Sequence, residues 1–119
     1  MPTQKKKVLI IEDSPDLQDS FAQELNGEVE ILQALAIPQA EEVFSKNPDI
    51  DLIASDGLVP DEISATIDLI KKIRQTYTGP IIAMSSTPKL REELMRAGCN
   101  YDCKRKKELP RMILKILGL

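Results

Sequence analysis

The stretch VLIIEDSP, at residues 8–15, decides how this chain folds. It begins with four consecutive apolar residues preceded by lysines, a pattern typical of a strand that is buried on both faces of a sheet. Glu12 and Asp13 end the run, and Ser14-Pro15 then indicates a helix N-cap followed by a proline in the first helical turn. The stretch therefore predicts a strand that leads through two acidic residues directly into a helix.

The same alternation of apolar runs and helical periodicity continues along the chain. Further strands are predicted at residues 29–34, 50–55, 81–84 and, weakly, 101–103. Helical patterns follow them, beginning near Pro38, Ile63, Pro88 and Pro110. Strands that alternate with helices indicate a parallel sheet covered on both faces, with right-handed crossovers. We predict a single domain over residues 1–119 with an α/β, flavodoxin-like fold, whose five parallel strands lie in the order 2-1-3-4-5.

The composition excludes several classes of function. The 119 residues include no His, which excludes His-based acid–base catalysis, His metal sites and Ser–His or Cys–His nucleophile pairs. The net charge is −3, and no aromatic residue is interleaved with the basic run at residues 5–7, so direct nucleic-acid binding is not expected.

The cysteines and the apolar runs indicate a cytoplasmic protein. If residues 99–103 are extended, the Cα atoms of Cys99 and Cys103 lie about 13 Å apart, too far for a disulfide, so both thiols are expected to be reduced. No apolar run reaches the roughly 20 residues of a membrane span, and the N-terminus lacks the apolar stretch of a signal peptide.

Acidic residues follow the two strands that should be neighbours at the centre of the sheet. Glu12 and Asp13 follow the first strand, and Asp56 follows the third. Ligands of such sheets bind beyond the carboxyl ends of the strands, where the strand order reverses, here between strands one and three. Two carboxylates about 5 Å apart repel by roughly 3 kcal/mol at an effective dielectric of 20. Proton uptake or a hard cation must offset that repulsion, and Mg²⁺ suits a few carboxylates, a carbonyl and several waters.

A hydroxyl and basic side chains are predicted at the same edge. The fourth strand ends at Ser85-Ser86, and the segment after the fifth strand offers Lys104 and Arg105. A hydroxyl and a cation can bind phosphate oxygens. Acids, a metal, a hydroxyl and a cation together suit phosphoryl transfer, where positioning and charge neutralisation supply most of the catalysis.

The motifs VLIIEDS, DLIASDGLVP, PIIAMSS and the AGC…KR segment resemble response-regulator receiver domains of two-component signalling, from about Lys5 to Leu119. The resemblance implies that Asp56 is the phosphoacceptor and that Glu12 and Asp13 bind the metal. It further implies that the Leu58 carbonyl is a backbone metal ligand, that Ser85 is the switch hydroxyl and that Pro60 is the loop proline.

Two alignments with the family pattern assign the phosphate-binding cation to different residues. The family pattern is an aromatic residue, two residues of any kind, then Lys-Pro. The spacing from Tyr101 favours Lys104, whereas an alignment without a gap from Gly98 favours Arg105. In both registers a basic residue replaces the usual proline. The loop after Asp56 also departs from the family, because Asp61-Glu62 stands where Asp-Gly is usual.

The resemblance implies a phosphoacceptor signalling domain rather than an enzyme acting on other substrates. Asp56 would take a phosphoryl group from a histidine kinase or phosphotransfer protein with Mg²⁺, and phosphorylation would switch a surface that binds a downstream protein. The alternative is a receiver-like interaction domain that binds a partner without phosphorylation. A Mg²⁺-dependent phosphatase is disfavoured, because Leu58 stands where that class usually carries a second Asp.

Overall fold

The computed structural model describes residues 5–57 and 63–119. Its strands form one parallel sheet in the predicted order β2-β1-β3-β4-β5. The strands are β1 (Lys7–Ile11), β2 (Glu30–Ala34), β3 (Leu52–Ser55), β4 (Ile81–Ala83) and β5 (Tyr101–Asp102). The predicted α/β fold class is therefore confirmed.

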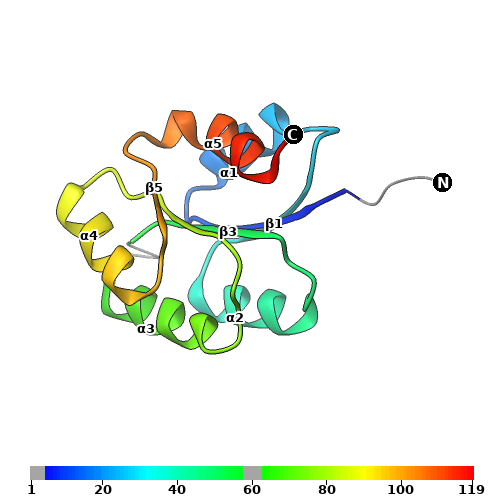
Figure 1. The fold of residues 1–119 in the computed structure, drawn as a ribbon. Coiled ribbons are helices and arrows are strands. Elements are labelled where there is room, and N and C mark those ends of the chain that lie inside the picture. The colour runs from blue at the N-terminus through cyan, green and yellow to red at the C-terminus, as the bar shows by residue number, and fades with distance from the viewer. Residues whose placement is uncertain (1–4, 58–62) are drawn as a thin grey trace.

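Helices cover both faces of this sheet, as Figure 1 shows. α1 and α5 lie on one face, and α2, α3 and α4 lie on the other. The helices are α1 (Pro15–Glu24), α2 (Ile37–Lys46), α3 (Ile63–Arg74), α4 (Pro88–Ala97) and α5 (Leu109–Leu117), with a short 3₁₀ helix at Lys106–Glu108. None of the described helices is long and apolar enough to cross a membrane.

The helix ends follow from local chemistry. Ser14 caps α1, since its hydroxyl oxygen accepts a hydrogen bond from the Leu17 N–H at 3.2 Å. Pro15 and Pro88 occupy first positions of their helices, where no backbone donor is needed. Gly98 ends α4 with a φ of 146°, a conformation that side-chain-bearing residues rarely adopt.

Alternate residues of the central strands feed two separate aliphatic cores. Leu9 and Ile11 face the core beneath α2, α3 and α4, whereas Val8 and Ile10 face the core beneath α1 and α5. All four side chains are fully buried. Burial on both faces explains why β1 is a continuous apolar run rather than an alternating one.

Small differences from the predicted elements lie at their ends. β3 starts at Leu52 rather than at residue 50, and β5 contains two residues rather than three. Cys99 and Cys103 are buried free thiols, as predicted. Leu58 and Pro60 lie outside the described residues, as do Asp61 and Glu62.

Candidate functional site

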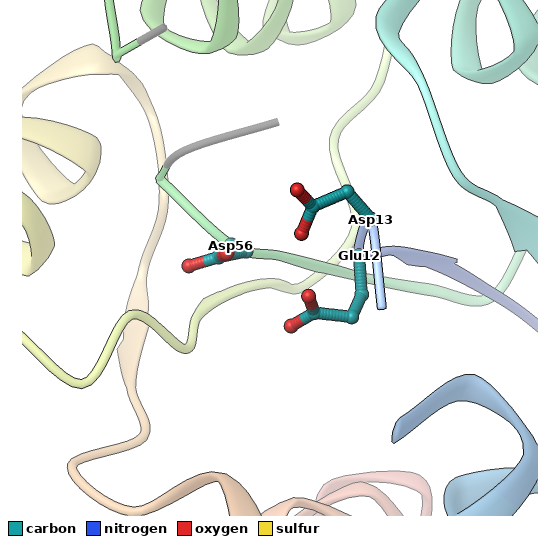
Figure 2. A group of neighbouring side chains, drawn as sticks. All are labelled: Glu12, Asp13 and Asp56. Carbon is teal, nitrogen blue, oxygen red and sulfur yellow. The ribbon is translucent and has the colours of Figure 1, made fainter. Parts of the chain in front are cut away.

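Strand pairing brings the ends of β1 and β3 together. Ile11 pairs with Ser55, and the backbone N–H of Asp56 donates to the Ile11 carbonyl at 2.9 Å. Glu12, Asp13 and Asp56 follow these strand ends directly, and Figure 2 shows their side chains gathered there. One carboxylate oxygen from each residue lies within 4.8 Å of those of the other two. The convergence predicted for these three acids is therefore present.

Glu12 is the most enclosed of these acids, with only 1% of its surface exposed. One carboxylate oxygen accepts a hydrogen bond from Lys106 Nζ at 2.6 Å, and the other accepts from the Ser14 N–H at 3.2 Å. Burial raises the pKa of Glu12, and the nearby Asp56 charge raises it further, while Lys106 opposes both effects. The site thus contains a carboxylate whose charge needs compensation.

Asp56 is also buried, with 7% of its surface exposed. Its Oδ1 accepts a hydrogen bond from the Gly57 N–H at 2.8 Å, and its Oδ2 lies 3.4 Å from Lys106 Nζ. A cation is therefore already placed where negative charge on Asp56 would need neutralising.

The basic side chain that contacts the acids is neither Lys104 nor Arg105, the two residues that the sequence predicted for the phosphate-binding role. Lys106 contacts the acids, whereas Lys104 and Arg105 are exposed and form no ion pair within the described part of the chain. The cause is Cys103, which is fully buried, donates its backbone N–H to the Ala83 carbonyl at 2.8 Å and anchors the segment after β5. The sequence contains an indication of this anchoring: Cys103 is the only apolar residue in the segment 102–108, and so the residue of that segment most expected to be buried.

Burial and hydrogen bonding act in opposite directions on the pKa of Lys106. Burial alone lowers it, but the hydrogen bond to Glu12 and the charges of Asp56 and Glu12 outweigh that effect, so the net pKa is raised. Lys106 therefore carries a proton at neutral pH and serves as the internal counterion of the acids.

Ser85 lies at the same edge, just beyond the end of β4. The preceding Met84 donates its N–H to the Ser55 carbonyl at 3.0 Å, which places Ser85 beside the segment that carries Asp56. The Ser85 side chain is nearly buried, and its Oγ accepts from the Thr87 N–H at 3.3 Å. Tyr101, the aromatic residue of one sequence register, is 40% exposed.

The acid cluster fits a hard divalent cation. Its donors are carboxylate oxygens, two of the three acids are buried, and Asp13 is partly exposed. Such a set of oxygens matches the preference of Mg²⁺, and the partly exposed acid leaves access for bound water. Glu12, Asp13 and Asp56 are the residues that would hold the ion.

No sequence family and no curated protein matches the chain. Solved structures do. A signal receiver domain of a two-component histidine kinase from Clostridium thermocellum is 19% identical with a TM-score of 0.78, covering 96% of this chain and 98% of that one. A CheY-like response regulator receiver domain protein from Methanospirillum hungatei JF-1 is 20% identical with a TM-score of 0.78, covering 97% and 95%. The chemotaxis response regulator CheY4 of Vibrio cholerae is 20% identical with a TM-score of 0.77, covering 96% and 99%.

These likenesses span nearly the whole of both chains. The protein therefore has the fold of CheY-like response-regulator receiver domains, as the sequence motifs suggested. The acid cluster stands at the edge of the sheet where strand order reverses, which is where this fold class binds ligands.

Proposed function

We propose that this protein is a phosphoacceptor signalling domain in which Asp56 accepts a phosphoryl group from a phosphohistidine of a partner protein. One observation carries the proposal: two further carboxylates, those of Glu12 and Asp13, and the Lys106 ammonium lie beside Asp56 at the carboxyl edge of the sheet. This set matches what phosphoryl transfer requires, namely a nucleophile, a metal site and a cation for the phosphoryl oxygens.

The transfer exchanges one bond to phosphorus for another. A carboxylate oxygen of Asp56 attacks the phosphorus atom, the P–N bond to the donor imidazole breaks, and the imidazole nitrogen keeps the electron pair. The product is an acyl phosphate on Asp56. Lys106, which lies 3.4 Å from Asp56 Oδ2, is placed to bind a phosphoryl oxygen of that product.

Bound Mg²⁺ would supply positive charge that neutralises the phosphoryl oxygens as the bond to Asp56 forms. Glu12 and Asp13 would hold it together with Asp56, and Lys106 would exchange part of its contact with Glu12 for the phosphoryl group. The Leu58 carbonyl, implied as a further ligand by the family resemblance, lies outside the described residues.

We further propose that Ser85 donates its hydroxyl to the acyl phosphate and that the accompanying shift changes a surface that binds a downstream protein. Slow attack of water on the acyl phosphate would reset the domain. On this proposal the protein catalyses its own phosphorylation and dephosphorylation, and its partners are a histidine kinase or phosphotransfer protein and a downstream target in the cytoplasm.

Intact mass spectrometry after incubation with Mg²⁺ and acetyl phosphate tests the proposal. One phosphoryl group should add to the wild-type protein, and none to Asp56→Asn. Chelation of the metal should abolish the addition. A wild-type protein that stays unlabelled, or an Asp56→Asn variant that still labels, would contradict the proposal.

A second candidate is a receiver-like domain that binds its partner without phosphorylation. The contact of Lys106 Nζ with Glu12 and Asp56 favours it, because the acids already possess an internal counterion. On this alternative, Asp56→Ala would bind the partner with unchanged affinity, and acetyl phosphate would leave the wild-type mass unchanged.

A further inference from the structure

Arg91 is a buried charged residue to which the proposed phosphoryl chemistry assigns no part. It lies in α4, and only 8% of its surface is exposed. A buried guanidinium is costly unless neighbouring oxygens compensate it. The contacts of the Arg91 guanidinium therefore indicate its role in the structure.

Two oxygens from different segments compensate this guanidinium. Arg91 Nη1 donates to the Ser85 carbonyl at 3.0 Å, and Arg91 Nε lies 2.6 Å from Asp102 Oδ1 in β5. The Nε–H of Arg91 does not point at Asp102 Oδ1. The contact between Arg91 and Asp102 is therefore a close ion pair rather than a hydrogen bond. A planar guanidinium can span two such acceptors, whereas a lysine ammonium is a single point charge.

The two polar groups of Ser85 are held with unequal strength. Its carbonyl accepts from a buried, charged donor at 3.0 Å, while its hydroxyl oxygen accepts from the neutral Thr87 N–H at 3.3 Å. Charge-assisted hydrogen bonds are the stronger kind. Arg91 thus fixes the Ser85 backbone, and the hydroxyl keeps its own proton to donate.

We propose that Arg91 is a positioning residue: it fastens the turn between β4 and α4 to β5 and so presents the Ser85 hydroxyl to the phosphoryl group on Asp56. This inference rests on the proposed function of Asp56. Asp102 supports the arrangement by supplying a negative charge 2.6 Å from Arg91 Nε. Arg91 itself touches no reacting atom.

A double-mutant cycle with Ser85 separates positioning from general stabilisation. Arg91→Met should lower the initial rate of labelling by acetyl phosphate about tenfold when Ser85 is present, because a hydrogen bond to a charged group is lost. Arg91→Lys should restore part of that rate. In a Ser85→Ala background Arg91→Met should cause no further loss. The matched control is Arg96→Met, an exposed arginine of the same helix, which should label at the wild-type rate.

Equal slowing by Arg91→Met in both backgrounds, or no slowing in either, would overturn the proposal. Hydrogen exchange of the Thr87 amide gives a readout that does not depend on phosphorylation. It should accelerate in Arg91→Met and stay unchanged in Arg96→Met, and unchanged exchange in both would also overturn the positioning role. A wild-type protein that fails to label refutes the function of Asp56, while the exchange measurement still decides whether Arg91 holds the Ser85 turn.

Discussion

Glu12 shows at the scale of a single residue how the site balances its charges. Its carboxylate is almost fully enclosed, yet both oxygens have donors, the Lys106 ammonium at 2.6 Å and the Ser14 amide at 3.2 Å. Ser14 also caps α1 through its side chain. Ser14, in the turn after β1, therefore binds the Glu12 carboxylate through its backbone and caps the start of α1 through its side chain.

Lys106 should be the basic residue on which phosphorylation depends. We expect Lys106→Met to slow labelling by acetyl phosphate about tenfold or more, because a cation beside Asp56 is lost. Lys104→Met and Arg105→Met are the matched controls, since both side chains are exposed. Initial rates measured by intact mass compare the three variants. If either control variant labels more slowly and Lys106→Met labels at the wild-type rate, the phosphate-binding cation is Lys104 or Arg105 and not Lys106.

Arg74 acts at the scale of whole elements. From the C-terminal end of α3 it donates two hydrogen bonds to the Gly98 carbonyl, at 3.0 and 2.7 Å, and one each to the carbonyls of Tyr77 and Gly79, at 2.9 and 2.8 Å. One side chain thereby joins α3, the loop into β4 and the end of α4. Gly98 leaves room for it, because a Cβ there would lie 3.2 Å from Arg74 Cβ.

Removing these bonds should weaken the whole domain. We expect Arg74→Met to lower the free energy of unfolding by about 2–3 kcal/mol, because partly buried carbonyls lose a charged donor. Lys72→Met on the same helix is the control. Its exposed ion pair with Glu41, at 3.0 Å, should contribute less than about 1 kcal/mol. Urea unfolding followed by circular dichroism gives both values, and similar losses in the two variants would contradict the role assigned to Arg74.

At the scale of the molecule, the core beneath α2, α3 and α4 contains two groups that ionise in alkali, the buried Cys99 thiol and the half-buried Tyr77 hydroxyl. Burial raises the pKa of the Cys99 thiol to about 12 and that of the Tyr77 hydroxyl to about 12. The Tyr77 hydroxyl has no hydrogen-bond partner among the described residues. Both groups thus favour the protonated form in the folded protein.

These raised pKa values predict a loss of stability in alkali. Below the unfolded pKa values, about 8.5 for Cys and 10 for Tyr, both states are protonated and the stability is fully present. As the pH rises toward 12 the unfolded chain ionises first, so the free energy of unfolding falls. Cys99 should account for about 3 kcal/mol of loss at pH 10.5, and Tyr77 for less, because an unfolded Tyr has a pKa only about half a unit below that pH.

Urea unfolding at pH 7, 9 and 10.5 measures this dependence. Cys99→Ala should flatten the alkaline decline, although it also leaves a small cavity that lowers stability equally at every pH. Tyr77→Phe should flatten the decline slightly and leave stability at pH 7 unchanged or higher, because it removes a buried hydroxyl without a partner. An unaltered pH dependence in both variants would contradict the assignment.

Much of the architecture could be predicted from periodicity and helix starts. The apolar runs predicted strand positions to within about two residues, since burial on both faces of a parallel sheet requires continuous hydrophobicity. The prolines at the first turns of α1 and α4 located those helices, because a proline there loses no hydrogen bond. The meeting of Glu12 and Asp13 with Asp56 followed from strand order alone.

The order of the elements and the acids at the ends of β1 and β3 can be predicted from sequence, because they depend on local patterning and on parallel pairing. Which cation reaches those acids was decided only by tertiary structure. Lys104, Arg105 and Lys106 are close in chemistry and adjacent in sequence, and burial of Cys103 turns the last of them inward. The contacts of Arg91 with Ser85 and Asp102 were decided in the same way, since side chains on separate elements meet only after the elements pack.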